Sequence, residues 1–266
     1  MIPTLSAIHI YPVKSFAALN PEQALVEARG LVGDRRWMIV DADGSFVTAR
    51  KHPSMVLVRA EFIDDGLQLS APGMPEMHVL PAPQRARVSA MVWESKVSTL
   101  PASEEADAWI SRYLGFPARF VHMDRECTRA IDSAYAPSGE EVSLADGFPL
   151  LLISQAALDG LNEKLGEPVD MRRFRPNLVV SGTPAHAEDG WRSIRIGGIR
   201  FDLVKACVRC VLTTVEPERG EFDATGEPLR TLIGYRRTVK GVTFGQNLIP
   251  RDSGRIRIGD SVEILD

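Results

Sequence analysis

Alternating apolar and polar residues recur along the chain in short runs, a period typical of half-buried β-strands. Residues 5–11 alternate in this way, and residues 54–100 form several further runs separated by turns rich in Gly, Pro and Asp. Two more runs, within residues 33–50, meet at Asp43-Gly44, a dipeptide that tolerates the positive φ of a tight hairpin turn. The pattern predicts barrel-like or sandwich modules built from short strands.

A helical period of 3.6 residues replaces the alternation in three segments. Residues 103–115 predict a helix with Ser103 as its N-cap, acidic residues in its first turn and Gly115 as its stop. Ser154 caps a second predicted helix that closes at Gly166, and a third begins near residue 227. The predicted fold class is therefore α+β, mainly β, with a few peripheral helices.

Residues 122–141 follow neither period and are interpreted as a linker or flap between two modules. We therefore expect an N-terminal module over residues 1–121 and a C-terminal module over residues 122–266. The longest apolar run, residues 148–153, is far shorter than the roughly 20 residues that cross a bilayer. The N-terminus also lacks the basic and apolar regions of a signal peptide. A cytoplasmic protein without membrane contact is expected.

Composition and charge narrow the class of partner. The chain has 266 residues, enough for a full core, and 44% of them are hydrophobic. Its formal net charge of −4 argues against bulk nucleic-acid binding, which requires a broad basic face. Three cysteines are an odd count, so a disulfide framework is not expected and a reducing compartment is the default.

Two of the three cysteines lie in one short stretch, residues 206–217. Cys207 and Cys210 flank Arg209, and a thiolate beside a cation is a natural ligand for a soft metal or a natural nucleophile. A zinc site would lack a second cysteine pair. A thioredoxin-like pair is disfavoured because the β-branched residues here predict a strand. Two buried structural cysteines would leave the arginine unexplained. A single-thiolate metal or sulfur site is slightly favoured, and the alternatives stay open.

Basic and polar residues gather at other predicted strand ends, far apart in the sequence. In isolation, Lys14 favours a solvated turn, and Asp146 favours a turn-forming role. Arg35 is as consistent with a structural carboxylate partner as with a ligand, and the basic stretch 171–177 is as consistent with a solvated loop as with a ligand site. If the strands of two barrels bring these ends together, they form a cationic pocket with one thiolate at its floor. Such a pocket suits an anionic organic cofactor that carries a thiophilic metal. The groups are Lys14-Ser15, Arg35, Arg175-Pro176-Asn177 and Arg209-Cys210.

Seven short motifs occur in order over nearly the whole chain, and together they are more specific than any one of them. They are Tyr11-Pro12-Val13-Lys14-Ser15, Gly33-Asp34-Arg35-Arg36-Trp37, Thr48-Ala49-Arg50, Asp146-Gly147-Phe148-Pro149, Phe174-Arg175-Pro176-Asn177, Cys207-x-Arg209-Cys210 with Thr213-Thr214-Val215, and Phe244-Gly245-Gln246. This set closely resembles the MOSC-domain proteins with an N-terminal MOSC β-barrel domain, a family that includes the mitochondrial amidoxime-reducing component and its bacterial relatives. The resemblance implies two β-barrel-like modules.

The resemblance also implies a molybdenum cofactor (Mo-molybdopterin), a pterin dithiolene with a phosphate tail whose metal takes a protein cysteine as a further ligand. Cys210 matches that ligand. Asp146 matches an acidic residue near the metal, and we expect it to help deliver protons, so that Cys210 and Asp146 are the expected catalytic residues. The positions that match the cofactor lining are Lys14, Ser15, Arg35, Arg175, Asn177, Val208, Arg209 and Cys210.

The activity implied by the resemblance is the reduction of small N-oxygenated substrates such as amidoximes, hydroxylamines and hydroxylamino-purines. The sequence contains neither a membrane anchor nor the four-cysteine pattern of an appended [2Fe–2S] domain. Electrons are therefore expected from a separate donor protein of the ferredoxin, flavin or cytochrome type. Two alternatives stay open: a sulfur-transfer or cofactor-carrier protein that uses a persulfide on Cys210, and a plain binding or regulatory module.

Overall fold

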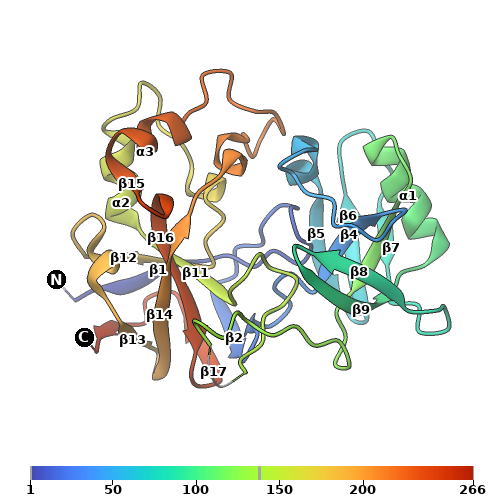
Figure 1. Ribbon diagram of the computed structural model, residues 1–266, viewed down its shortest axis with the longest axis horizontal. Helices are drawn as coiled ribbons and strands as arrows, with labels where there is room; N and C mark the ends of the chain where they lie inside the picture. The colour runs from blue at the N-terminus through green and yellow to red at the C-terminus, as the bar shows by residue number, and fades with distance from the viewer. Residues whose placement is uncertain (1, 137–138, 266) are drawn as a thin grey trace.

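The computed structural model describes residues 2–136 and 139–265, which form two β-rich modules side by side (Figure 1). The larger module is built on an eight-stranded sheet in which β1, β12, β11, β16, β14, β13 and β18 follow one another and β15 pairs with β16. Its strands are β1 (Thr4–Ile8), β11 (Leu150–Ser154), β12 (Leu178–Ser181), β13 (Ser193–Ile196), β14 (Ile199–Val208), β15 (Arg237–Thr238), β16 (Gly241–Pro250) and β18 (Val262–Ile264).

The first strands of the chain belong to this larger module, together with the C-terminal half of the sequence. Strand β1 pairs antiparallel with β12. A three-stranded sheet next to it is ordered β17-β2-β3. Its strands are β2 (Gln23–Glu27), β3 (Gly30–Leu31) and β17 (Gly254–Arg257). Both chain ends therefore lie on the same module, as Figure 1 shows.

The smaller module contains a four-stranded sheet in the order β4-β10-β9-β8 and a three-stranded sheet in the order β5-β6-β7. The predicted boundary between residues 121 and 122 falls inside strand β10 (Ala118–His122), which pairs with β4 and β9. The strands are β4 (Trp37–Asp41), β5 (Arg59–Ile63), β6 (Gly66–Ser70), β7 (Met77–Val79), β8 (Val88–Val92), β9 (Ser95–Pro101) and β10 (Ala118–His122).

Helix α1 (Glu104–Leu114) has the caps that the sequence predicts. The Ser103 side chain accepts a hydrogen bond from the backbone N–H of Ala106, and Gly115 ends the helix in the left-handed region at φ 80°. The helix packs against β10 of the smaller module. Together with the two sets of sheets, it confirms the α+β, mainly β fold class with two barrel-like modules and peripheral helices.

Helix α2 (Gln155–Asn162) begins at the predicted cap but ends earlier than predicted, before Gly166. The Asn162 side chain exchanges two hydrogen bonds with the backbone of Val169, and such side-chain bonds compete with continuation of a helix. Helix α3 (Leu229–Arg236) begins close to its predicted position.

Two predicted strands are shorter in the structure than the sequence indicates. Strand β14 ends at Val208, and residues Val211–Thr214 form a short 3-10 helix. The Thr213 hydroxyl donates to the Cys210 carbonyl at 2.9 Å, a back-bond that favours a turn over a strand. The second run of the 33–50 hairpin is likewise reduced to a bridge, because Phe46 donates its backbone N–H to Met91 of β8.

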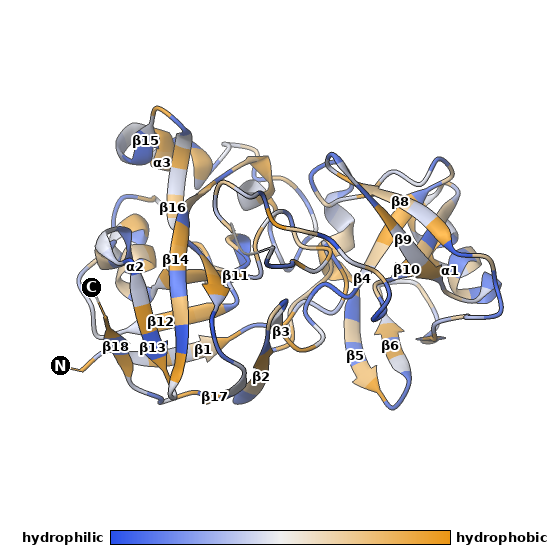
Figure 2. Ribbon diagram, turned by 60° about the horizontal axis from the view of Figure 1, so that its bottom comes forward, coloured by the Kyte–Doolittle hydropathy of each residue, from blue (hydrophilic) through white to orange (hydrophobic). Residues whose placement is uncertain are grey.

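Hydrophobic residues are concentrated on the strands of both modules (Figure 2). In the smaller module, the rings of Phe16 and Trp37 both meet Phe120 edge-on, with centroids 6.1 Å and 6.5 Å away. Phe16 follows β1 in sequence, so its ring anchors the segment that leaves the larger module. Within the described residues, no helix has both the length and the hydropathy needed to cross a bilayer.

Candidate functional site

Residues from both modules line a cavity of about 150 Å³ at their junction. The topology explains why distant sequence segments meet here. Because β1 and β12 are antiparallel neighbours, the last residue of β1 pairs with the first residue of β12. The chain leaving β1 and the chain entering β12 therefore lie side by side at the same end of the two strands. Every sequence-predicted site residue lines this cavity: Lys14, Ser15, Arg35, Asp146, Arg175, Asn177, Val208, Arg209 and Cys210.

The sulfur of Cys210 lies beside a cation that the sequence analysis did not place in the site. Arg50 donates from Nε to Cys210 Sγ at 3.4 Å, and the same guanidinium pairs with Asp146. The family motif Thr48-Ala49-Arg50 was the available signal, because a lone arginine in a turn does not reveal which side chains it will contact.

The three cysteines lie in different surroundings. Arg209 donates from Nη1 to Cys207 Sγ at 3.0 Å, and Cys207 also packs against the apolar cluster that includes Phe174. Cys127 is 1% exposed within a core cluster of the smaller module. No group of three or more His, Cys, Asp or Glu that could hold a metal occurs within residues 2–136 and 139–265. The described residues therefore give a four-ligand zinc site no support.

Asp146 is an anion held between two cations. Its carboxylate accepts from Lys14 Nζ at 2.7 Å and from Trp93 Nε1 at 3.2 Å, and it pairs with Arg50. Partial desolvation would raise the pKa of this half-exposed carboxyl, but Lys14 and Arg50 outweigh it and hold the pKa of Asp146 well below its usual range. Burial lowers the pKa of Lys14 to about 8, although Asp146 opposes this shift.

The ring of Tyr11 lies between two guanidinium groups. The centroid of the ring is 4.3 Å from Arg35 Cζ and 4.1 Å from Arg175 Cζ. Asp34 neutralises Arg35 at 2.6 Å, whereas no ion pair joins Arg175 to a carboxylate among the residues that the structure describes. Burial lowers the pKa of Arg175 to about 10 and raises the pKa of Tyr11 to about 12.

Asn177 connects three segments at the base of the cavity. Its Oδ1 accepts from Arg35 Nη1 at 3.0 Å and from the backbone N–H of Leu151 at 3.2 Å, while Nδ2 donates to the His9 carbonyl at 3.1 Å. The side chain is almost completely buried. Asn177 therefore holds Arg35 in place relative to β11.

Two buried nitrogen atoms of the cavity, Arg175 Nη2 and Arg209 Nε, have no hydrogen-bond partner within the described chain. A buried cationic donor without a partner is costly, so it favours an anionic or strongly accepting ligand. Arg209 is otherwise fixed by donation from Nη2 to the Phe174 carbonyl at 2.6 Å. The cavity thus combines a thiol with cationic donors still able to bind an acceptor.

Backbone strain is concentrated in this region. Ser15, Arg35 and Arg175 adopt positive φ angles of 74°, 47° and 56°, and all three line the cavity. A positive φ is uncommon for residues other than glycine, and it persists where the surrounding structure over-determines the backbone, often at functional sites. The same strain occurs at Trp93, which contacts Asp146, and at His186 elsewhere.

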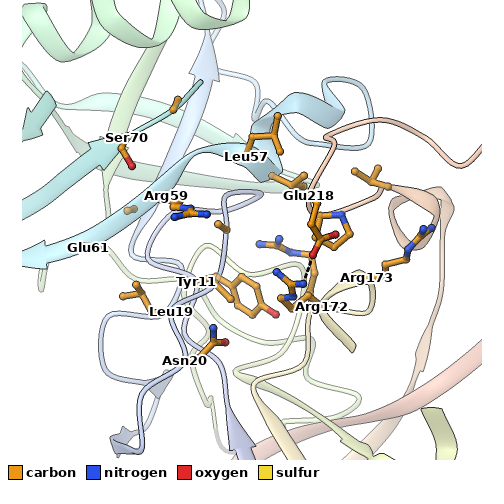
Figure 3. A pocket seen from close by; sticks show the side chains of 18 of the residues that line it. Tyr11, Leu19, Asn20, Leu57, Arg59, Glu61, Ser70, Arg172, Arg173 and Glu218 are labelled. Atoms are coloured by element: carbon orange, nitrogen blue, oxygen red, sulfur yellow. Dashed lines mark hydrogen bonds and ion pairs between the residues drawn. The ribbon is translucent and has the colours of Figure 1, made fainter. Parts of the chain in front are cut away.

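A larger cavity of about 800 Å³ shares Arg175 and Leu212 with the first (Figure 3). Tyr11 projects into it between residues of the two modules. Two of its cations have carboxylate partners, because Arg172 pairs with Asp170 and Glu218 and Arg173 pairs with Glu216. The residues that line this cavity also include no cysteine. The smaller cavity is therefore the better candidate site for an anionic cofactor.

The fold and the two family models that match it define the class: the chain is a MOSC-domain protein, and both Cys207 and Cys210 line its cavity. The family model described as the MOSC N-terminal beta barrel domain matches residues 2–117, and the MOSC domain model matches residues 139–263. Within that class, the chain belongs to the family of the mitochondrial amidoxime-reducing components.

Relatives in that family align over nearly the whole chain. Mitochondrial amidoxime-reducing component 1 of Xenopus laevis is 35% identical over 278 residues, which cover 97% of this chain and 81% of the relative. Mitochondrial amidoxime reducing component 2 of Rattus norvegicus is 36% identical, and the alignment covers 98% of this chain and 83% of the relative. The crystal structure of the YuaD protein from Bacillus subtilis covers 99% of this chain and 95% of its own, with 14% identity and a TM-score of 0.46. That similarity is too weak to bear on function.

Proposed function

We propose that this protein is a molybdenum-cofactor oxidoreductase that reduces N-hydroxylated compounds. The observation that carries the proposal is the sulfur of Cys210 in a cavity whose cations retain unpartnered donors. The named activity of relatives that are about a third identical to this chain points to the same reaction class.

The donor set fits the cofactor. Cys210 supplies the soft thiolate that a thiophilic metal prefers. Arg175 and Arg209 offer free donors to an anionic or carbonyl-rich ligand, because planar guanidinium groups bind phosphate and pterin oxygens well. The remaining residues proposed to line the cofactor are Lys14, Ser15, Arg35, Asn177 and Val208.

When bound, the cofactor supplies two-electron chemistry, in which the N–O bond of the substrate breaks with uptake of two electrons and two protons to give the amine or amidine and water. We propose that a separate protein of the ferredoxin, flavin or cytochrome class supplies the electrons. The chain itself orients the ligands: Arg50 fixes the Cys210 sulfur, and Asp146 fixes Arg50 and Lys14.

The environment of Asp146 refines its expected role in proton delivery. A carboxyl whose pKa lies far below neutrality stays ionised and is a poor proton store. Lys14 has a pKa of about 8, so it holds a proton at neutral pH and can release it under mild conditions. We therefore propose that Lys14 is the proton reservoir and that Asp146 positions it.

Protein made in a host that synthesises the cofactor tests the proposal. We expect about one molybdenum atom per chain and reduction of an amidoxime by a chemically reduced donor. A Cys210→Ser variant should lose both metal and activity, while a Cys127→Ser variant keeps both because Cys127 lies in a separate core. Loss of activity with full retention of metal in Cys210→Ser would assign the metal ligand to another residue.

The same contact between Arg50 and Cys210 supports a second candidate, because a guanidinium also stabilises a persulfide anion. In a sulfur-transfer protein, Cys210 would carry one extra sulfur atom, which adds about 32 Da to the intact mass. Such a mass increase that disappears in Cys210→Ser, with bound cofactor but no turnover, would favour this candidate over the reductase.

A further inference from the structure

A third cavity, of about 700 Å³, adjoins the proposed cofactor cavity and shares Asp146, Gly147 and Phe148 with it. Four aromatic side chains line this third cavity, and we name it the aromatic cleft. The four are Phe46, Trp93, Tyr135 and Phe148. They come from both modules and from the segment that connects them, so the cleft lies where the modules meet the site.

Trp93 is the most unusual of the four. It occupies the tight turn between β8 and β9, the residue is 52% exposed, and its φ is 56°. A bulky residue at a positive φ is a genuine outlier, and Gly or Asn would suit this turn better. The ring is nevertheless held in one orientation, by the bond from Nε1 to Asp146 and by Phe46, whose centroid is 5.2 Å away.

The other aromatic side of the cleft is also fixed. Tyr135 and Phe148 meet edge-on with centroids 5.5 Å apart. Lys205 Nζ lies 4.6 Å from the Tyr135 centroid and 5.8 Å from that of Phe148, so a cation holds both rings. Rigid aromatic surfaces bind flat ligands with little loss of side-chain entropy.

We propose that the aromatic cleft is the substrate subsite and that it selects flat aromatic or heteroaromatic N-hydroxylated compounds over aliphatic ones. The ring of the substrate stacks in the cleft, and its N–OH group reaches the cofactor cavity past Asp146, where the two cavities join. The lining includes the carboxylates of Glu94, Asp132 and Asp146 and the cations of Arg129 and Lys205, so charges of both signs surround the rings and the subsite suits a ring without net charge. This inference rests on the proposed function for the N–OH group of the ligand, whereas the binding of the ring is argued from the aromatic cleft.

Equilibrium binding without an electron donor tests the subsite separately from turnover. Benzamidoxime and acetamidoxime carry the same reacting group, and only the first has a ring. We expect the wild-type chain to bind benzamidoxime at least about tenfold more tightly, measured by calorimetric titration. Trp93→Gly should remove most of that difference, and its thermal unfolding midpoint should stay within a few degrees because glycine suits the backbone at this position.

Two further variants separate stacking from other effects. Trp93→Phe keeps an aromatic face and should keep most of the preference for benzamidoxime. Phe222→Ala removes an exposed aromatic residue that lines neither cavity, and it should bind both compounds like the wild type. The proposal is overturned if folded Trp93→Gly retains the tenfold preference, or if Phe222→Ala loses it equally.

Kinetics with the cofactor-loaded chain complete the test. The ratio of kcat/KM for benzamidoxime to that for acetamidoxime should fall about tenfold in Trp93→Gly, chiefly through KM for the aromatic compound. An unchanged ratio in an active variant would refute the subsite while leaving the reductase proposal intact. Ring-dependent binding that needs Trp93, with no reduction of either compound, would support the subsite and refute the proposed reaction.

Discussion

The guanidinium of Arg50 joins the thiol and the carboxylate of the candidate site, with its Nε 3.4 Å from Cys210 Sγ and an ion pair to Asp146. Arg50 follows the β4 segment of the smaller module, whereas Cys210 follows β14 of the larger one. The relative position of the two modules therefore determines the surroundings of the sulfur.

Replacement of Arg50 should impair function more than cofactor content. Residues that orient a metal ligand typically contribute about 10- to 100-fold in metal affinity or activity. We expect Arg50→Gln to lower kcat/KM by this order while most of the molybdenum remains bound through Cys210. Arg50→Lys should recover little of the lost activity, because a single ammonium cannot replace a guanidinium whose separate nitrogen atoms contact Cys210 and Asp146. Metal analysis and steady-state kinetics on the same preparations check both statements, and a fully active Arg50→Gln would contradict them.

Cofactor retention should weaken as the pH rises through about 8. Burial lowers the pKa of Lys14 to that value, so its positive charge is present below pH 8 and lost above it. An anionic cofactor then loses one favourable charge. The molybdenum content per chain is measured after dialysis at pH values from about 6.5 to 9.5, a range that brackets the pKa of Lys14. Lys14→Arg should flatten the profile because a guanidinium stays protonated over this range.

The same pKa predicts how the cofactor-free chain responds to pH. Lys14 has a folded-state pKa of about 8, below the ordinary value of 10.5, so between these values the unfolded chain binds more protons than the folded chain. The free energy of unfolding gains a positive slope with pH in that window through Lys14. Urea unfolding at about pH 8 and pH 10 should show a larger increase in the wild type than in Lys14→Met, which keeps the contributions of the other titrating groups.

Tyr11 should tolerate loss of its hydroxyl but not of its ring. The Tyr11 hydroxyl oxygen is buried with no hydrogen-bond partner within the described residues, so Tyr11→Phe removes an unsatisfied polar atom and should change stability by less than about 1 kcal/mol. Tyr11→Ala leaves a cavity between Arg35 and Arg175 and should cost about 3–5 kcal/mol. Chemical unfolding of the two variants measures the difference, and equal losses would contradict the role given to the ring.

Asn177 should prove essential for the stability of the site. Asn177→Ala removes bonds to Arg35, Leu151 and His9 in a buried position, with an expected cost of about 2–4 kcal/mol. Asn20→Ala is the matched control, because Asn20 is exposed and its side chain accepts one bond from His9. That control should change the free energy of unfolding by less than about 0.5 kcal/mol. Urea unfolding midpoints compare the two variants.

Local chemistry in the sequence predicts the helices better than the site. The α1 caps follow from Ser103 and Gly115, because each acts on the backbone next to it. A 3-10 turn at Thr213 replaces the predicted strand. β-Branched residues favour strands, but here the Thr213 hydroxyl donates a hydrogen bond back to the Cys210 carbonyl. Membership of Arg35 and Arg175 in one cavity depends on the pairing of β1 with β12, and the ordered family motifs were needed to predict it.

The position of Trp93 had no signal in the sequence. A tryptophan followed by glutamate, between two β-runs, looks like an ordinary exposed turn residue, and nothing nearby indicates the distant Asp146. Its contact with the candidate site depends on the positive φ at this residue and on the hydrogen bond from its Nε1 to Asp146. Contacts between side chains of different modules are set by tertiary packing, which local patterns do not encode.

The pairing of β1 with β12 also constrains how the chain can be made and divided. Ser6 donates its hydroxyl to Val179, a residue 173 positions later, so the earliest strand stays without its neighbour until most of the polypeptide has been synthesised. Such long-range closure slows folding. A cut near residue 121 would also remove β1, β2 and β3 from the sheets that they complete. The larger module can therefore be produced alone only if the N-terminal segment that contains these three strands is supplied with it.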